Sequence, residues 1–286
     1  MPTVYVVGSE KRGTLHDVAT VWKDGVATPL TDGSRYAWAL SVAISGSDVY
    51  VVGLENKTEL GPGVAMVWKN GIATPLTDGT TDASASSVAI SGSDVYVAGS
   101  ESNGTHQVAK VWKNGVATPL TDGTHAASAL SVAVSGSDVY VAGTEYAGTA
   151  GLRIAMVWKN GVPTPLTDGS KDARALSVTI SGRDVYVAGA EFGGTAPPLH
   201  LAIVWKNGVP AALPLTDVAD DASAESVAVS GDDIYVAGGV ESRTSFSRSS
   251  FLFDVAMFWK NGIATPLTRT DGTEEGWASS VLVKQH

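Results

Sequence analysis

Short apolar runs, separated by Gly, Asn, Asp or Pro, recur along the whole chain. The pattern in residues 86–121 predicts four short strands, which we name A to D from the inside of a sheet outwards, at 87–90, 95–99, 108–113 and 116–120. Asn114-Gly115, between the last two runs, indicates a two-residue hairpin turn, because both residues of a type I′ turn need positive φ. Pro119 cannot donate a ladder hydrogen bond, so strand D is expected at the sheet edge.

The same pattern is repeated six times. A V-W-K or F-W-K motif places its Trp at positions 22, 68, 112, 158, 205 and 259. Residues 66–101 and 110–145 differ at only 7 of 36 positions. A period of about 48 residues is the size of a four-stranded propeller blade. The sequence therefore predicts an all-β fold, a six-bladed β-propeller of four-stranded antiparallel blades.

The two ends of the sequence predict how this ring closes. The sequence starts at a B strand and ends at a sixth A strand, 280–283, which we expect to pair with the N-terminal blade. Residues 284–286 and 1–3 then replace the Ser-Gly-Ser-Asp turn of the other repeats. This gives a single β-propeller domain over 1–286, with approximate blades at 279–286 plus 1–31, 40–77, 86–121, 130–167, 176–216 and 225–268.

The predicted strands are apolar on both faces, which is typical of sheets covered by neighbouring sheets. The repeated Trp and Tyr side chains are therefore expected to pack between blades. A role as an aromatic ligand cage is the alternative.

Composition excludes several classes of protein. Nineteen basic against 29 acidic residues give a net charge of −10, so there is no basic stripe for nucleic acid. No apolar run approaches the length of a membrane span, and no signal peptide is visible. The absence of Cys excludes disulfides and thiolate chemistry. We predict no cofactor and no metal, and we expect a monomer.

The repeats resemble a known group of proteins. S-V-A-V-S-G-S-D-V-Y-V-A-G (131–143) and V-W-K-N-G-V-A-T-P-L-T-D-G (111–123) look like the highly repetitive β-propellers of bacterial surface and secreted proteins. The repeats are also kelch-like, with a B strand ending in Gly, T-P-L in strand D and one diglycine, Gly238-Gly239. The resemblance covers essentially the whole chain. It implies binding or scaffolding, an extracellular or cell-surface location and no transferable catalytic motif.

One face of the disc is the better candidate for binding. The A–B and C–D turns are nearly invariant between repeats, whereas the B–C and D–A connections on the opposite face diverge. Binding residues concentrate on loops held by a rigid scaffold. Drift of unconstrained loops is the alternative.

A set of acidic residues recurs at the start of the B–C segments. Its members are Glu10, Glu55, Glu101, Glu145, Glu191 and Glu241. A second set lies in the D–A turns, and its members are Asp32, Asp78, Asp122, Asp168, Asp217 and Asp271. These acids form either an acidic rim for a cationic partner or local hydrogen bonds to turn backbone, and the local interpretation is favoured.

A variable position just before strand A carries the second candidate site. It is occupied by Trp38, Ser84, Ser128, Arg174, Ser223 and Trp277. With Tyr36, two residues before Trp38, the two Trp side chains could form an aromatic platform for a sugar ring. The alternative is that they fill a wider seam where the termini meet.

Enzyme signatures are weak. The five His residues share no repeat position, and no nucleophile elbow is present. We therefore expect a non-enzymatic binding or scaffold module that contacts a glycan or protein partner through the loop face. A glycoside hydrolase or lyase at the channel mouth and a ligand-free repeat scaffold are the alternatives.

Overall fold

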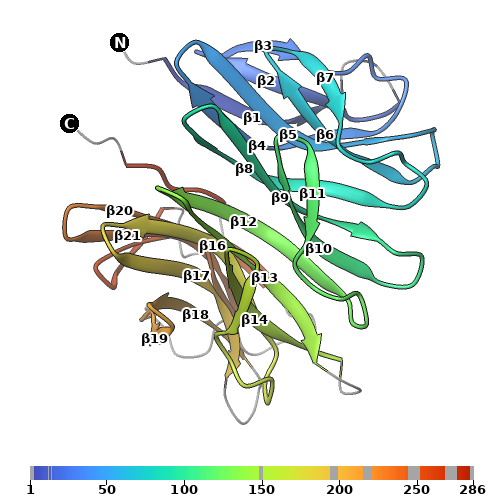
Figure 1. Cartoon of the computed structure of the whole chain (residues 1–286). Coiled ribbons are helices and arrows are strands. Elements are labelled where there is room, and N and C mark those ends of the chain that lie inside the picture. The colour runs from blue at the N-terminus through green and yellow to red at the C-terminus, as the bar shows by residue number, and fades with distance from the viewer. Residues whose placement is uncertain are drawn as a thin grey trace. The chain divides into compact units, whose positions relative to one another are not determined.

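The computed structural model describes residues 3–11, 13, 15–147, 151–193, 199–214, 221–243, 252–267 and 276–283. Within these ranges the regular structure is entirely β (Figure 1). No helix among them has the length and apolar character needed to cross a membrane.

The strands form six antiparallel sheets, each following chain order. The first has three strands, β1 (Tyr5–Glu10), β2 (Val18–Lys23) and β3 (Val26–Pro29). The other five have four strands each: β4 (Ala37–Ser45), β5 (Asp48–Asn56), β6 (Gly63–Lys69), β7 (Ile72–Pro75); β8 (Ala83–Ser91), β9 (Asp94–Ser102), β10 (Gln107–Lys113), β11 (Val116–Pro119); β12 (Ala127–Ser135), β13 (Asp138–Ala147), β14 (Leu152–Lys159), β15 (Val162–Pro165); β16 (Ala173–Ser181), β17 (Asp184–Gly193), β18 (Leu199–Lys206), β19 (Val209–Ala212); β20 (Asp221–Ser230), β21 (Asp233–Arg243), β22 (Leu252–Lys260), β23 (Ile263–Pro266).

The chain divides into two compact units. One consists of residues 1–141 and 158–162, and the other of residues 142–157 and 163–286. The division passes through the sheet β12–β15. The single domain over 1–286 stays a prediction.

The predicted turns and outer strands are confirmed. Every C–D turn has positive φ at both central residues, as at Asn70 (51°) and Gly71 (82°), which is the geometry that Asn-Gly favours. Strand D ends at Pro in all sheets except the one that contains β19, and it pairs with strand C alone. Its place at the sheet edge follows from the missing N–H.

The predicted A and B strands are too short. In the third sheet, β8 and β9 have nine residues each, because the hairpin continues past a register shift between Ala85 and Ser87. This register shift is a β-bulge, and the Gly that ends the predicted B strand faces it. An added Cβ at Gly99 would lie 2.1 Å from the Ser84 carbonyl oxygen. The bulge therefore explains the Gly at four of these places, Gly53, Gly99, Gly189 and Gly238.

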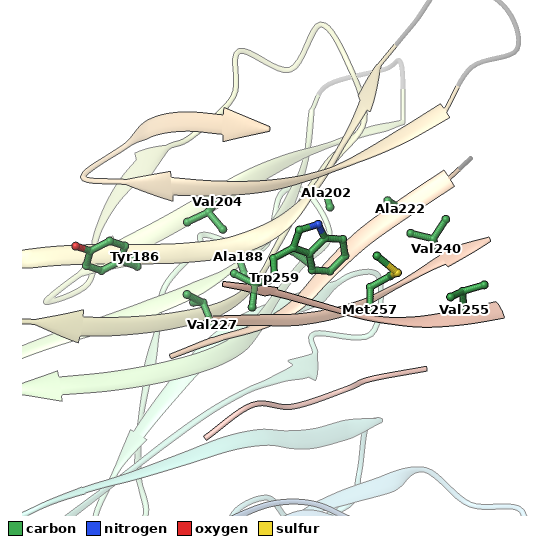
Figure 2. Packing of buried hydrophobic residues seen from close by; sticks show 12 residues of the cluster. Tyr186, Ala188, Ala202, Val204, Ala222, Val227, Val240, Val255, Met257 and Trp259 are labelled. Atoms are coloured by element: carbon green, nitrogen blue, oxygen red, sulfur yellow. The ribbon is translucent and has the colours of Figure 1, made fainter. Parts of the chain in front are cut away.

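The core confirms that the repeated Trp side chains pack between sheets. Trp259 of β22 is fully buried among Ala188, Ala202 and Val204 of the preceding sheet (Figure 2). Trp68 packs in the same way on β2, and Trp112 on β6. Large aromatic side chains supply most of the apolar area in such an interface.

A serine hydroxyl connects successive A strands. Ser41 Oγ accepts a hydrogen bond from Val88 N at 3.3 Å, and Ser177 Oγ accepts one from Val227 N at 3.3 Å. Ser226 Oγ accepts one from Val281 N at 3.2 Å, so 280–283 runs beside β20 as an A strand would.

Residues 276–283 form no regular strand, and among the described residues β1 has no inner neighbour in its sheet. Val6 of β1 is 53% exposed, whereas Val51 at the same repeat position is 1% exposed. Pairing of 280–283 with β1, and with it ring closure, stays a prediction.

Candidate functional site

The variable position lies inside strand A rather than before it, which corrects the predicted boundaries. Trp38 is the second residue of β4, and Arg174 is the second residue of β16. Both therefore sit at the edge of the bulge. The carbonyl oxygen of each lies 1.9 Å from the Cβ position that Gly53 or Gly189 leaves empty. Strand pairing holds these side chains in place, so they do not depend on loop conformation.

One pocket combines residues that break the repeat. It belongs to the second unit, has a volume of about 220 Å³, and is lined by Arg174, Ala190, His200, Asp221, Ala222, Ser223, Glu225 and Trp277. Two of these, Arg174 and Trp277, are candidates from the sequence. Glu225 was missed, although the bulge position that it occupies holds Leu or Ser in the other repeats. Its departure from that pattern was the signal that could have found it.

The polar groups of the pocket differ in whether they have a hydrogen-bond partner. Asp221 Oδ1 accepts a hydrogen bond from His200 N at 2.6 Å, so this acid fixes the start of β18. Arg174 Nε is buried and has no acceptor among the described residues. A buried donor without a partner carries a desolvation cost that a bound acceptor would remove.

Trp277 forms one wall of the pocket through an exceptional contact. Its ring lies against Gly239, where an added Cβ would be 2.2 Å from Cε3. The other five B strands carry Ser9, Leu54, Ser100, Thr144 and Ala190 at this place. The second Gly of the diglycine thus makes room for the indole, which stays 41% exposed.

The first unit contains a separate aromatic group. Tyr36 and Trp38 stack with ring centroids 5.7 Å apart and planes 5° from parallel. His16 meets the edge of Tyr36 at 4.6 Å, and its ring nitrogens lie 3.2 Å from Gly33 O and 3.3 Å from Glu59 Oε1. The structure therefore brings Tyr36 and Trp38 together. Their predicted union with Trp277 is untested, because Trp277 belongs to the other unit.

The recurring Glu residues lie in B strands, not in B–C loops, because the A–B hairpins extend past the bulge. Most have individual partners. Arg35 Nη2 is 2.8 Å from Glu55 Oε1, Lys110 forms an ion pair with Glu101, Lys171 is 3.5 Å from Glu191, and Thr20 donates to Glu10 at 3.4 Å. Burial raises the pKa of Glu55, and Arg35 opposes that shift. Glu145 also has an interaction partner, and the side chain of Glu241 lies outside the described residues.

The D–A turn acids behave as the local interpretation predicts. Asp32, Asp78, Asp122 and Asp168 each accept a hydrogen bond from the backbone N–H two residues later, at 2.8–2.9 Å. Hydrogen bonds from that Ser or Thr lower the pKa of these carboxyl groups. Asp217 and Asp271 lie outside the described residues. In the described part of the chain no group of three His, Asp or Glu residues is placed to hold a metal ion.

The opposite face carries a repeated bracket of side chains that the sequence did not reveal. In the second sheet Asp48 accepts hydrogen bonds from Lys69 Nζ at 2.7 Å and Asn70 Nδ2 at 2.8 Å, and Lys69 lies 5.1 Å above the Tyr50 ring. These bonds lower the pKa of Asp48 and raise that of Lys69. The bracket joins the A–B turn to the C–D turn, and it recurs around Asp94, Asp138, Asp184 and Asp233.

Comparison with solved structures finds propellers. The acylaminoacyl peptidase of Pyrococcus horikoshii matches with a TM-score of 0.54 and 11% identity over 94% of this chain. TolB from Acinetobacter baumannii matches with a TM-score of 0.54 and 9% identity over 96% of it. The fold is a six-bladed β-propeller. The chain spans 44% and 65% of those two chains, and at this identity the likeness concerns the fold alone. No family model and no curated protein matches the sequence.

Proposed function

We propose that this protein is a non-enzymatic glycan-binding module and that its ligand enters the pocket lined by Arg174, Glu225 and Trp277. One observation carries the proposal. Within an array of nearly identical repeats, three residues that depart from the pattern converge on one pocket of the second unit.

The three side chains supply complementary chemistry. The exposed indole of Trp277 offers a flat apolar face for the C–H side of a sugar ring. Arg174 offers N–H donors, and Glu225 offers carboxylate acceptors. Sugar hydroxyls can therefore accept hydrogen bonds from Arg174 and donate hydrogen bonds to Glu225. The cavity of about 220 Å³ is smaller than the roughly 300–1,000 Å³ of pockets for drug-sized ligands, which suits a single sugar ring.

The expected affinity is modest. About 0.3 kcal/mol per non-hydrogen atom, over the roughly 12 such atoms of a hexose, corresponds to millimolar binding. Oligosaccharides that reach beyond the pocket are expected to bind more tightly because they add contacts.

A titration of Trp fluorescence with glucose, galactose and mannose, followed by a glycan array, tests the proposal. Trp277→Ala is expected to abolish binding. Trp38→Ala is the matched control, since Trp38 has the same repeat position in the other unit, and it should leave binding intact. The proposal fails if no glycan binds, or if Trp38→Ala abolishes binding and Trp277→Ala does not. Analysis of the incubated glycans for cleavage products tests the hydrolase alternative directly.

A further inference from the structure

We infer, on the basis of the proposed function, that the preferred sugar of this pocket carries both an ammonium and a carboxylate group. The ammonium lies on the indole of Trp277 beside Glu225, and the carboxylate pairs with Arg174. The ligand class is then a zwitterionic amino sugar. Arg174 and Glu225 bring opposite charges to one pocket, and no ion pair joins them in the part of the chain that the structure describes.

The order of the strands separates the guanidinium from the indole. The serine hydrogen bonds between A strands place β20 between β16 and residues 280–283. Arg174 belongs to β16, and Trp277 precedes 280–283, whereas Asp221 and Glu225 belong to β20 itself. A ligand that fills the pocket therefore meets the guanidinium from one side of β20, the indole from the other side, and the carboxylates between them.

The guanidinium of Arg174 needs an acceptor that the described residues do not supply. Its Nε is buried and has no hydrogen-bond partner among them. The acid nearest to it in sequence, Asp172, is occupied by Arg153, whose Nε donates to Asp172 Oδ1 at 2.9 Å. Arginine presents its N–H donors in a planar fork that matches the two oxygens of a carboxylate. A carboxylate on the ligand would therefore give Arg174 both a counter-charge and its missing acceptor.

Glu225 and Trp277 together are suited to a cation. Glu225 stands in the bulge of β20, and its carboxylate has no hydrogen bond or ion pair within the described ranges. The other repeats hold Leu or Ser at this position, so the charge is specific to this pocket. Asp221 already accepts a hydrogen bond from His200 N, which leaves Glu225 as the acid for a ligand. The exposed indole of Trp277 attracts an ammonium through its π electrons, and Trp is the best aromatic side chain for this contact.

A ligand with both charges is the one that gives both residues a counter-charge. A neutral hexose offers hydroxyl groups to Arg174 and Glu225, but it leaves two charges partly desolvated and unpaired. An ammonium alone pairs with Glu225 and leaves Arg174 unpaired, and a carboxylate alone does the reverse. Hydrogen bonds between charged groups are roughly twice as strong as neutral ones, so each added charge should tighten binding.

Isothermal titration calorimetry with four related sugars tests this pairing at pH 6, where the amines and carboxyl groups of the probes are charged. Glucose carries neither charge, glucosamine carries the ammonium, glucuronate carries the carboxylate, and muramic acid carries both. Each singly charged sugar is expected to bind about tenfold more tightly than glucose, and muramic acid more tightly than either. Glu225→Gln should abolish the gain of glucosamine and leave that of glucuronate. Arg174→Gln should do the reverse.

Glu59→Gln is the matched control, because it removes the same charge at an exposed side chain of the other unit and should leave all four affinities unchanged. Thermal unfolding of each variant verifies that it is folded. If muramic acid binds no more tightly than glucose, or if the two pocket variants leave the gains unchanged, the zwitterionic ligand is refuted while glycan binding stands. A gain for only one singly charged sugar refutes the pairing at the other residue. If none of the four sugars binds, the proposed function fails, and the zwitterionic ligand fails with it.

Discussion

The diglycine Gly238-Gly239 allows a sharp test, because its two residues face different obstacles. An added Cβ at Gly238 would lie 2.0 Å from the carbonyl oxygen of Ser223, which is backbone held in a strand pair. An added Cβ at Gly239 would lie 2.2 Å from Cε3 of Trp277, which is a half-exposed side chain. We therefore compare Gly238→Ala with Gly239→Ala.

The structure gives the relative magnitudes. In Gly238→Ala the overlap exceeds 1 Å and can be relieved only by moving the bulge, so a loss of about 2–4 kcal/mol is expected, at the upper end of overpacking effects. In Gly239→Ala the indole can rotate away from its neighbour. The stability loss should then be under about 1 kcal/mol. However, the pocket loses the Trp277 indole as its apolar wall, and sugar affinity should fall at least about tenfold.

Scanning calorimetry and sugar titration measure the two effects. At roughly 2–3 °C per kcal/mol for a chain of this size, Gly238→Ala should lower Tm by about 4–12 °C and Gly239→Ala by about 3 °C or less. Equal losses of Tm in the two variants would refute the account of the bulge. Unchanged sugar affinity in Gly239→Ala, alongside lost affinity in Trp277→Ala, would refute the account of the platform.

Three further predictions concern the core, the turn brackets and the ring. Trp112→Ala should lower the free energy of unfolding by about 3–5 kcal/mol, because Trp112 is fully buried, whereas Trp277→Ala should lower it by less than about 1 kcal/mol. Similar losses in the two variants would contradict the assignment of Trp112 to the core. The bracket aspartates have a pKa below 3.8, so their contribution to stability is complete above that value and is lost as the pH falls through the lowered pKa. Tm should therefore decline below about pH 4, and less steeply when Asp48, Asp94, Asp138, Asp184 and Asp233 are all changed to Asn; an equally steep decline would exclude the brackets as the cause. The repeat register predicts that Val6→Cys with Val281→Cys forms a disulfide in this Cys-free chain; a disulfide-free monomer under oxidising conditions would contradict ring closure.

Local signals in the sequence determine much of the fold. Asn70-Gly71 and its counterparts fix the C–D turns by their positive φ, and Pro75 marks the edge strand by its missing donor. The buried Trp68 and Trp112 followed from the six-fold recurrence of one large apolar residue. Each of these features depends on a residue and its immediate neighbours, so the sequence pattern was sufficient.

The missed features depend on pairing across strands. The extension of β8 and β9 requires the bulge at Ser86 and the Gly99 that faces it, and apolar alternation does not reveal such a register shift. Glu225 departs visibly from the Leu or Ser of the other repeats, but its place in the bulge follows only from the strand register. The Asp48–Lys69–Asn70 bracket joins the A–B turn to the C–D turn, and the sequence of either turn alone does not contain that contact.

The central claim is that a sugar binds against Trp277, and the indole N–H signals in a ¹H–¹⁵N NMR spectrum test it most directly. The chain has eight Trp residues, of which Trp68, Trp112, Trp158, Trp205 and Trp259 are fully buried. Comparison with Trp277→Phe assigns the Trp277 signal. We predict that it shifts progressively as glucose, galactose or mannose is added, while the signals of the buried Trp residues and of Trp38 stay in place. A Trp277 signal that does not move with any of these sugars, or a shift at Trp38 instead, would contradict the account.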